Sequence, residues 1–366
     1  MGMAADGGPP LRVLTVITPA RYSGAERMAV YLADGLQQRG HHVVLACKHN
    51  DLLLEALAER GIESRVLPIA GKANLLAPLF LAVEARRVGA DVIHTHLSTA
   101  ALWGSMAGQI AGIPTLAHAH ALNTRTCFML ADLVATCSQG VQEFLVGQGM
   151  PASKTRVLYN GVYPEQFEGL PGRTAMRAAL GLRPDSPVIG EVGHLSPKKG
   201  QRALLEATAI LCRRWPDLVC LLVGEGEDRE ALAALARDLG IADAVRLLGY
   251  RDDAPAVMQA MDVVVLPSVW KEGLPVVLVE AAFVCRPAVG SDAPGIREVI
   301  SHGETGLLTP PQDAQRLAAT LARLLEDPAL AARMGEAARA RALHMFSVER
   351  MAQTAEAIYR ELLQNR

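Results

Sequence analysis

The chain has 366 residues, of which 50% are hydrophobic and 20% are charged. This length suits two domains of ordinary size, and the composition excludes an intrinsically disordered protein. The formal net charge of -2 gives no electrostatic reason to expect nucleic acid as a partner.

The sequence gives no sign of a metal or disulfide site. The six cysteines form no CxxC pair and no framework of close spacings, so reduced thiols are expected. No DxD lies beside a strand end, and no cluster of His, Cys and Asp has the spacing of metal ligands. We therefore expect neither a required metal nor a cofactor.

Two features predict a cytoplasmic chain. The N-terminal MGMAADGGPPLRV lacks the charged and apolar regions of an export signal. The longest apolar stretch, 75–83, has nine residues and contains Pro78, whereas roughly 20 residues are needed to span a bilayer.

The first half alternates between apolar strands and helices, which predicts a parallel sheet wrapped by helices. Residues 11–17 form a β-branched strand that leads to Gly24, and helical spacing begins near Ala25. The amides at such a helix start can bind an anion. No GxGxxG follows this strand, so the dinucleotide-binding fingerprint is missing. The later elements are HHVVLACK, LLLEALAERG, ESRVLPI, 75–87, ADVIHTHL, TAALWGSMAGQIAG, IPTLAHAHALN, LVATCS and RVLYNGV.

The segment IPTLAHAHALN carries two histidines that are candidates for a site. On a strand, His118 and His120 point the same way, and they lie at the carboxyl end, where ligands of open α/β sheets bind. A structural role is the alternative for each of them.

The alternating pattern starts again after a linker. Residues 164–187 are rich in Gly, Pro and charge, which predicts a linker with a short helix. Strand, loop and helix then recur through PVIGEVGHLSPKKGQRALLEATAIL, CLLVGEGEDREALAALARDLG, AVRLLGY, PAVGSDAPGIREVI and GLLTP, and an amphipathic stretch at 346–363 follows. We predict domains at 1–165 and 166–345, and a C-terminal helix within 346–366.

The sequence pattern predicts a buried strand at 261–266, followed by a loop and a helix in the stretch 266–280. Pro275 is expected at the first helical position. Glu272 falls in the loop and Glu280 on the second helical turn, so the two carboxylates reach different parts of a ligand. The ligand would lie across the amides of Gly273, Leu274 and Val276.

These residues carry a resemblance to a known family. Glu272 and Glu280 in EGLPVVLVE resemble the E-x7-E motif of the GT4 retaining glycosyltransferases. GHLSPKKG resembles their G-R-L-x-P-x-K-G loop. SGAERM resembles their GGAE(R) loop with Ser23 for the first glycine, and RVLYNGV resembles their NGVD turn with Tyr163 for Asp.

The resemblance covers nearly the whole chain and is strongest at 193–280. It implies a GT-B fold, in which two Rossmann-like domains with parallel sheets face each other across a deep cleft. The first domain would bind the acceptor and the second the nucleotide-sugar, and the C-terminal helix would cross back to the first domain.

The resemblance also implies roles for single residues in the second half. Lys199 falls on the motif's lysine, which would neutralise charge on the leaving diphosphate. His194 replaces the motif's arginine and lacks its permanent charge and fork geometry. Glu280 would bind the ribose hydroxyls, and Glu272 would hold the transferred sugar without acting as a nucleophile.

Further contacts follow from the same resemblance. The amides of Gly273, Leu274 and Val276 would support the sugar or the phosphates, and Tyr250 and Arg251 fall where the base-contacting loop lies. Gly24 would lie at the donor from the first domain. Family members have a histidine that touches the donor sugar, for which His120 is our first choice and His118 the second.

The implied function is transfer of a sugar from a UDP-, GDP- or ADP-sugar to an acceptor, with retention and without a metal. Biosynthesis of cell-surface polysaccharide, glycolipid or glycoconjugate is the expected setting. A lipid-linked acceptor would place the chain at the inner face of the membrane. For Arg86, Arg87 and Arg125, contact with headgroups and a solvated surface are the alternatives, of which the solvated surface is favoured. Two alternatives within the enzymes are a phosphorolytic or hydrolytic outcome and a GT-B epimerase. Outside the enzymes, the alternative is a non-catalytic nucleotide-sugar sensor, which the lost arginine at 194 favours.

Overall fold

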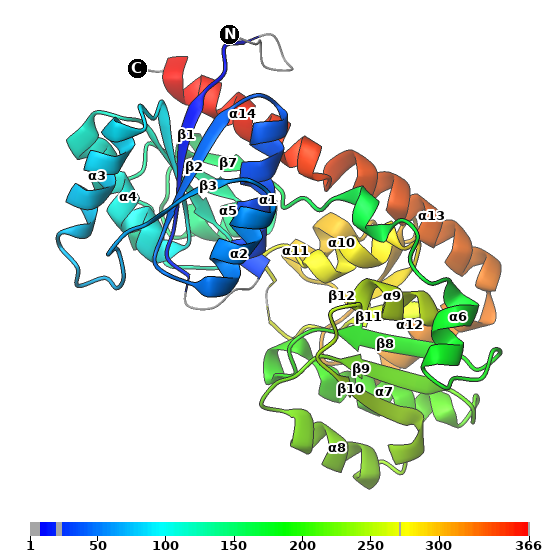
Figure 1. Cartoon of the computed structure of the whole chain (residues 1–366). Coiled ribbons are helices and arrows are strands. Elements are labelled where there is room, and N and C mark those ends of the chain that lie inside the picture. The colour runs from blue at the N-terminus through cyan, green and yellow to red at the C-terminus, as the bar shows by residue number, and fades with distance from the viewer. Residues whose placement is uncertain (1–7, 20–23, 271, 365–366) are drawn as a thin grey trace. The chain divides into compact units, whose positions relative to one another are not determined.

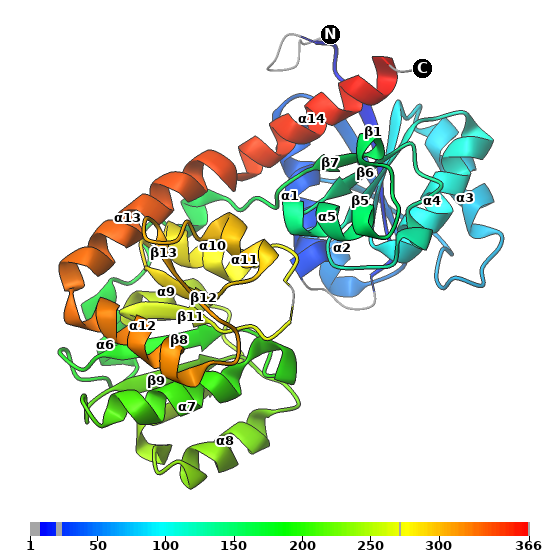
Figure 2. The ribbon, with the colours of Figure 1, turned by 180° about the vertical axis from the view of Figure 1, so that it is seen from behind.

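The structure, a computed structural model, describes residues 8–19, 24–270 and 272–364 (Figures 1 and 2). The chain divides into two compact units. The first unit is Met1–Val162 with Met345–Arg366, and the second unit is Tyr163–His344. The boundaries that the sequence predicts fall after residues 165 and 345.

The first unit is built on a parallel sheet of seven strands in the order β3-β2-β1-β4-β5-β6-β7. The strands are β1 Arg12–Ile17, β2 His42–Cys47, β3 Glu63–Val66, β4 Val92–His96, β5 Thr115–Ala119, β6 Leu133–Thr136 and β7 Thr155–Val157. The helices are α1 Gly24–Gln38, α2 Asp51–Glu59, α3 Ala77–Arg87, α4 Ser98–Ala111, α5 Gln139–Gly147 and α14 Val348–Gln364, with the short turns η1 Arg125–Cys127 and η2 Ala152–Lys154.

The central strands of this sheet are buried on both faces, as their continuous apolar runs require. Leu14, Val16 and Ile93 pack against α3 and α4 through Leu81 and Trp103. Each fully buried aliphatic side chain contributes about 1.5–3 kcal/mol. Successive residues of a strand alternate between faces. The residues on either side of Ile93 in β4 therefore face the opposite side of the sheet.

Helix α14 packs on α1, although more than 300 residues separate them in the chain. A Cβ at Gly35 would lie 2.7 Å from Val348, so only glycine permits this approach. The buried Glu356 carboxylate accepts hydrogen bonds from Arg39 at 2.8 and 3.0 Å and from Arg360 at 3.0 Å. His41 Nε2 lies 3.3 Å from it. The C-terminal helix is therefore part of the first unit (Figures 1 and 2).

The second unit has a parallel sheet of six strands in the order β10-β9-β8-β11-β12-β13. The strands are β8 Val188–Val192, β9 Val219–Val223, β10 Val245–Gly249, β11 Val263–Leu266, β12 Ala288–Ser291 and β13 Gly306–Thr309. The helices are α6 Arg173–Ala179, α7 Gln201–Cys212, α8 Arg229–Asp238, α9 Ala254–Ala260, α10 Val276–Phe283, α11 Pro294–Val299, α12 Ala314–Glu326 and α13 Pro328–Met345, with the turns η3 Pro164–Phe167, η4 Pro197–Lys199 and η5 Ala242–Ala244.

Helices cover both faces of the second sheet. One core packs α7, α8 and α12 onto the sheet through Leu204, Leu232 and Leu321. The other packs α6, α9 and α10 onto it through residues such as Met176 and Val257. Layers of helix, parallel sheet and helix define the doubly wound α/β class in each unit.

Strand order places a switch point in each sheet. In the first unit the order reverses between β1 and β4, and in the second between β8 and β11. Loops that leave the carboxyl ends of two such strands diverge to opposite faces of the sheet, which opens a crevice where ligands bind. The residues after β8 and β11 are therefore candidates for a ligand-binding site.

Two local predictions need correction. Pro275 is the N-cap of α10 and not its first helical residue, since its ψ of 97° lies outside the helical range. The predicted strand at 261–266 begins only at Val263, because Met261 still closes α9 through its backbone N–H bond to Met258. Among the residues that the structure describes, no helix combines the length and the apolar character needed to cross a membrane.

Candidate functional site

Lys199 and Glu272 meet at the switch point of the second sheet. Lys199 ends η4 after β8, and Glu272 lies in the loop after β11. Lys199 Nζ donates a hydrogen bond of 2.8 Å to Glu272 Oε1, and Ser268 Oγ donates one of 2.6 Å to the same oxygen. Both charged side chains remain partly exposed, at 24% and 19%. The structure thus brings together two residues that were predicted to act at one site.

Glycines without side chains allow the loops of this site to contact one another through their backbones. A Cβ at Gly200 would lie 2.0 Å from the carbonyl oxygen of Pro267, and Val269 N donates to Lys198 O at 2.9 Å. A Cβ at Gly295, at the start of α11, would lie 2.0 Å from Gly273 O. The loops after β8, β11 and β12 therefore fix one another without intervening side chains.

The loop after β9 joins the same assembly. A Cβ at Gly224 would lie 1.9 Å from Gly193 O, and one at Gly226 would lie 2.1 Å from Leu195 O. Leu195 N donates to Glu225 O at 3.0 Å. Four loops at one edge of the sheet, which surround Lys199 and Glu272, are thus in close backbone contact.

Sequence reasoning missed the buried carboxyl beneath this pair. Glu191, in β8, is 1% exposed, and Gln201 Nε2 donates to its Oε1 at 3.2 Å and to His194 O at 3.1 Å. Burial raises the pKa of Glu191 well above its usual value, Lys199 opposes the shift, and Glu272 adds to it. The available signal was a lone acidic residue inside the apolar strand VIGEV.

His194 is paired with a carboxylate on the surface. Its Nε2 lies 2.8 Å from Glu227 Oε2, and the two side chains are 51% and 61% exposed. The pKa of Glu227 is lowered first by its own backbone N–H and then by His194. An anionic ligand at His194 would therefore compete with Glu227.

Helix α10 supplies the second carboxylate and the helix start. Glu280 lies on its second turn and is half-buried. Leu278 N bonds to Pro275 O at 3.0 Å, so the amide of Val276 precedes the first hydrogen bond of the helix. Gly273 is partly exposed, whereas the side chain of Leu274 is buried, which leaves only its backbone for a ligand.

Tyr250 and Arg251 follow the carboxyl end of the edge strand β10. Tyr250 is 75% exposed. Arg251 donates to both Asp253 oxygens at 2.7 and 2.6 Å. Both residues thus lie at the same edge of the sheet as Lys199, two strands away from β8.

The second unit offers matched groups for a charged sugar ligand. Lys199 is a cation with three donors, and the first turn of α10 adds free amides. Glu272 and Glu280 are acceptors suited to hydroxyl groups. A diphosphate near the cation and the helix start, with sugars on either side, would satisfy all of them.

In the first unit, Gly24 is exposed and begins α1, the helix that follows the switch-point strand β1 in the chain. Among the described residues, nothing lies within 4 Å of a Cβ built there. Ser23, in the predicted glycine loop, lies outside the described residues.

His118 and His120 belong to a larger group, the four-histidine cluster of His94, His96, His118 and His120. His94 and His96 lie on β4 and His118 on the neighbouring strand β5, with His96 directly opposite His118 in the register, and His120 follows the end of β5. The rings of His118 and His120 stack at 4.0 Å, those of His94 and His96 at 4.5 Å, and those of His96 and His120 at 5.1 Å. His120 alone of the four is partly exposed.

Burial lowers the pKa of all four rings. For His94, His96 and His118 it falls well below 6.5, and for His120 it falls to about 4, although a hydrogen bond with Asn160 opposes that shift. The rings are therefore neutral at neutral pH. His94 Nδ1 lies 2.6 Å from Tyr359 Oη, and His96 Nδ1 lies 2.8 Å from His120 Nε2.

This cluster corrects one expectation from the sequence. Ligand atoms of His94, His96 and His118 lie within 4.8 Å of one another, so a group with metal-ligand spacing does exist. The signal was present as HTH and HAH on consecutive strands. It was missed because the two pairs become neighbours only through the pairing of β4 with β5.

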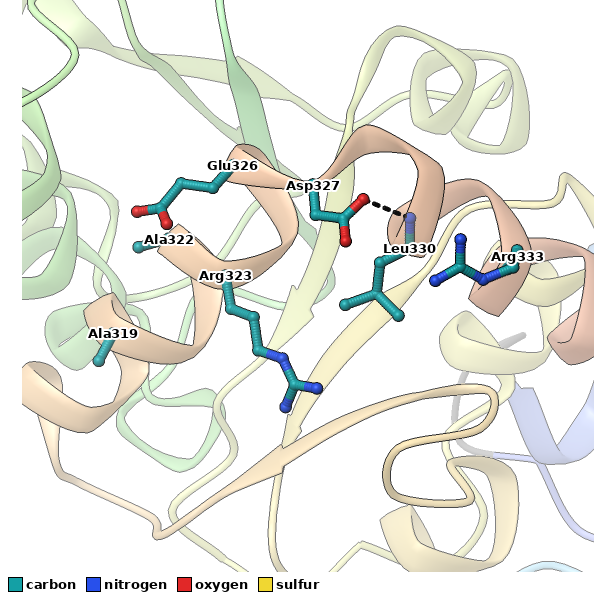
Figure 3. A pocket seen from close by; sticks show the side chains of 7 residues that line it. All are labelled: Ala319, Ala322, Arg323, Glu326, Asp327, Leu330 and Arg333. Carbon is teal, nitrogen blue, oxygen red and sulfur yellow. Dashed lines mark hydrogen bonds between the residues drawn. The ribbon is translucent and has the colours of Figure 1, made fainter.

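Two pockets of the second unit lie away from Lys199. Figure 3 shows one of about 710 Å³ between the end of α12 and the start of α13, where Asp327 accepts a hydrogen bond of 2.9 Å from Leu330 N. The other, of about 570 Å³, is lined by Pro187, Asp262 and Pro287, which precede β8, β11 and β12. It therefore lies at the amino ends of the strands, opposite to the edge at which ligands of such sheets bind.

Comparisons with known proteins agree with this architecture. The family model described as Glycosyltransferase Family 4 matches residues 22–166, and that described as Glycosyl transferases group 1 matches residues 172–341. The UDP complex of HepE from Anabaena superposes with a TM-score of 0.86 at 27% identity and covers 96% of this chain and 100% of that chain. HepE with UDP-glucose gives a TM-score of 0.83 at 28% identity, over 95% and 99% of the two chains.

Two relatives differ in how much of their length is matched. The Alpha-D-kanosaminyltransferase of Streptomyces kanamyceticus is 33% identical over 192 residues, which are 52% of this chain and about half, 49%, of that protein. The UDP-Gal:alpha-D-GlcNAc-diphosphoundecaprenol alpha-1,3-galactosyltransferase of Escherichia coli is 25% identical over 334 residues, 84% of this chain and 86% of that protein.

The two Rossmann-like units and these matches define an enzyme of the glycosyltransferase class with the GT-B fold. Within that class the chain belongs to the GT4 type, as the matches of the two family models to its first and second halves together show. The predicted family, the α/β class and the transferase activity are confirmed.

Proposed function

We propose that the chain moves a sugar from a UDP-sugar to an acceptor with retention of configuration. The observation that carries this proposal is the hydrogen-bonded pair of Lys199 and Glu272 at the switch point of the second sheet. The complexes of HepE with UDP and UDP-glucose support UDP over GDP or ADP as the nucleotide.

In the proposed donor complex, each group of the site has one task. The Lys199 ammonium and the free amides of α10 bind the diphosphate, and Glu280 accepts hydrogen bonds from the ribose hydroxyls. Glu272 exchanges its bond with Ser268 for hydroxyls of the transferred sugar. Tyr250 and Arg251 lie beside the base.

The proposed chemistry breaks the bond between the anomeric carbon and the diphosphate oxygen. The acceptor oxygen attacks the same face of the sugar, and its proton passes to the departing phosphate. Lys199 stabilises the charge that grows on that phosphate, which is a preorganised electrostatic effect. No carboxylate attacks the sugar, and the reaction needs no metal. His120 is proposed to contact the donor sugar from the first unit.

For the acceptor we propose a sugar carried on a lipid, as in cell-surface polysaccharide or glycolipid synthesis. The diphosphoundecaprenol acceptor in the name of the Escherichia coli relative supports this. So does an exposed apolar surface on and beside α3, which we call the α3 surface: Leu75, Leu76, Leu79, Phe80 and Val83. Arg86 and Arg87 end the same helix and are exposed. Apolar side chains beside cations suit an anionic membrane surface.

Turnover tests the proposal directly, because the His194–Glu227 pair stands where the motif has an arginine. The alternative that the sequence left open is a sensor that binds the donor without reacting. Purified chain, pretreated with a chelator, is incubated with UDP-hexoses and a sugar–diphosphate–polyprenol, and released UDP and the anomeric configuration of the product are measured. UDP release with an α-linked product supports the transferase. An inverted product contradicts retention, and donor binding without UDP release favours the sensor.

A further inference from the structure

The four-histidine cluster contains more nitrogen ligands than a contact with the donor sugar requires. His94, His96 and His118 are 0 to 1% exposed, so they cannot reach a substrate directly. They lie on the sheet face opposite to α4, since Thr95, between the first two, contacts Gly104 of that helix. Tyr359 of α14 borders them on their own side.

The nitrogen atoms of this cluster are not satisfied within the protein. His94 Nε2, His96 Nε2 and both ring nitrogens of His118 are buried without a hydrogen bond of normal geometry, although a weaker backbone hydrogen bond with Leu158 opposes the lowering of the His118 pKa. A buried polar group without a partner costs about 1–3 kcal/mol. Several of them in one place point to a missing ligand.

The geometry of the three rings is close to that of a metal site. Their ligand atoms lie within 4.8 Å of one another, so a point exists within about 2.8 Å of all three. A zinc–nitrogen bond is about 2.0 Å long, so each nitrogen needs to move by roughly 0.8 Å or less. Small rotations of the imidazoles provide such a shift.

The Nδ1 atoms of His94 and His96 already have hydrogen-bond partners that orient the two rings. His94 Nδ1 bonds to Tyr359 Oη, and His96 Nδ1 bonds to His120 Nε2, which leaves the Nε2 atom of each ring for an ion. Hydrogen bonds of this kind fix the tautomer and direction of metal-binding histidines. The partners that a metal site needs beyond its ligands are therefore in place.

We propose that His94, His96 and His118 of the first unit bind a divalent d-block cation, with zinc as the first choice. Three imidazoles suit zinc, cobalt or nickel and disfavour the oxygen-seeking magnesium and calcium. The fourth tetrahedral position is left to water, since His120 Nε2 bonds to His96 Nδ1. His120 is partly exposed and marks the side from which the ion enters.

This ion has no part in the proposed sugar transfer. Its ligands belong to the first unit, whereas Lys199, Glu272 and Glu280 belong to the second. Its effect is to join β4 to β5 and to hold the His96 ring that bonds to His120. Metal binding should therefore be measurable without any donor or acceptor.

The experiment uses the full chain without affinity-tag histidines, stripped with a chelator and dialysed. Zn²⁺ is titrated against a chromophoric competitor, and Co²⁺ binding is followed by visible absorption, which is strong only for a tetrahedral ion. We expect one ion per chain, a raised Tm with Zn²⁺ and no effect of Mg²⁺. Absence of a bound ion, or only the weak absorption of six-coordinate Co²⁺, overturns the proposal.

Variants locate the ion. His118→Gln should weaken Zn²⁺ binding by more than about tenfold, and Tyr359→Phe, which removes only a partner of His94, by roughly tenfold. The matched control is His49→Gln, which changes an exposed histidine of the same unit and should leave the affinity unchanged. If His118→Gln fails to fold, the wild-type stoichiometry and Tyr359→Phe decide. Equal affinities for Tyr359→Phe and the wild type contradict the assigned site.

Discussion

Gly200 lies directly against the carbonyl oxygen of Pro267, where a Cβ would approach to 2.0 Å. Its φ of +76° also falls in the region that favours glycine. The residue before it is Lys199, and the loop it touches carries Glu272. The position of the lysine relative to the carboxylate is therefore set by a backbone contact as well as by their hydrogen bond.

Gly200→Ala should separate the two loops and lower kcat by at least tenfold, because a small misplacement of a catalytic charge is costly. The loss of stability should be about 1–3 kcal/mol. Kinetic assays and urea unfolding of the second unit measure the two effects. The matched control is Gly240→Ala, which has a φ of +70° but no atom within 4 Å of the added Cβ. Equal kcat values for the two variants would contradict this role of Gly200.

Glu280→Ala should act on donor binding more than on turnover, since the proposed contact is with the ribose and does not change in the transition state. We expect KM for the UDP-sugar to rise about tenfold, with kcat within a factor of about three. Steady-state kinetics at saturating acceptor give both constants. Glu336→Ala, at an exposed position of α13, is the control. A comparable rise in KM for the control would remove the assignment of Glu280.

Burial raises the pKa of Glu191 well above its usual value, so the carboxyl is expected to keep its proton to a higher pH in the folded state than in the unfolded state. The folded state then binds a proton that the unfolded state has lost. The free energy of unfolding should therefore fall as pH rises from 4.5 toward the folded pKa. Glu191→Gln mimics the protonated carboxyl and should abolish this part of the pH dependence while it retains most of the activity.

Urea unfolding of the second unit at pH 5 and pH 8, for the wild type and Glu191→Gln, measures that difference. Glu206→Gln, whose partner Arg202 is exposed, provides the control. If Glu191→Gln is inactive and unfolds with the wild-type pH dependence, Glu191 is ionised and serves as a second partner of Lys199.

The α3 surface is expected to bind anionic membranes. Replacing Leu79 and Val83, which are 50% and 68% exposed, by serine should lower vesicle binding by tenfold or more, at little cost in stability. Co-sedimentation with vesicles of anionic and zwitterionic lipid measures the binding, and salt should weaken it by screening Arg86 and Arg87. Leu343→Ser, at an exposed leucine of α13, is the control. Unchanged binding by the double variant would show that another surface carries it.

The architecture of each unit was largely predictable, because its signals are local. Apolar runs of strand length that alternate with helical spacing require a parallel sheet, and glycine turns after strands mark the loops of the site. The placement of Lys199 and Glu272, 73 residues apart, at one site followed from motif resemblance and not from periodicity, whereas their hydrogen bond was not predicted.

Other features depend on contacts between distant segments and could not be predicted. Burial of Glu191 requires the neighbours of β8 on both sides, and the four-histidine cluster requires the register of β4 against β5. The bond between His94 and Tyr359 joins residues 265 positions apart. No single-sequence pattern encodes such pairs.

The most direct test of the central claim is the turnover of Lys199→Ala with a UDP-sugar and a working acceptor. Loss of one preorganised cation should raise the barrier by ~2 to 4 kcal/mol, which is about a 30- to 900-fold fall in kcat. Lys48→Ala, at an exposed lysine of the first unit, should match the wild type. A kcat of Lys199→Ala within a factor of about three of the wild-type value would contradict the claim that Lys199 stabilises the departing diphosphate.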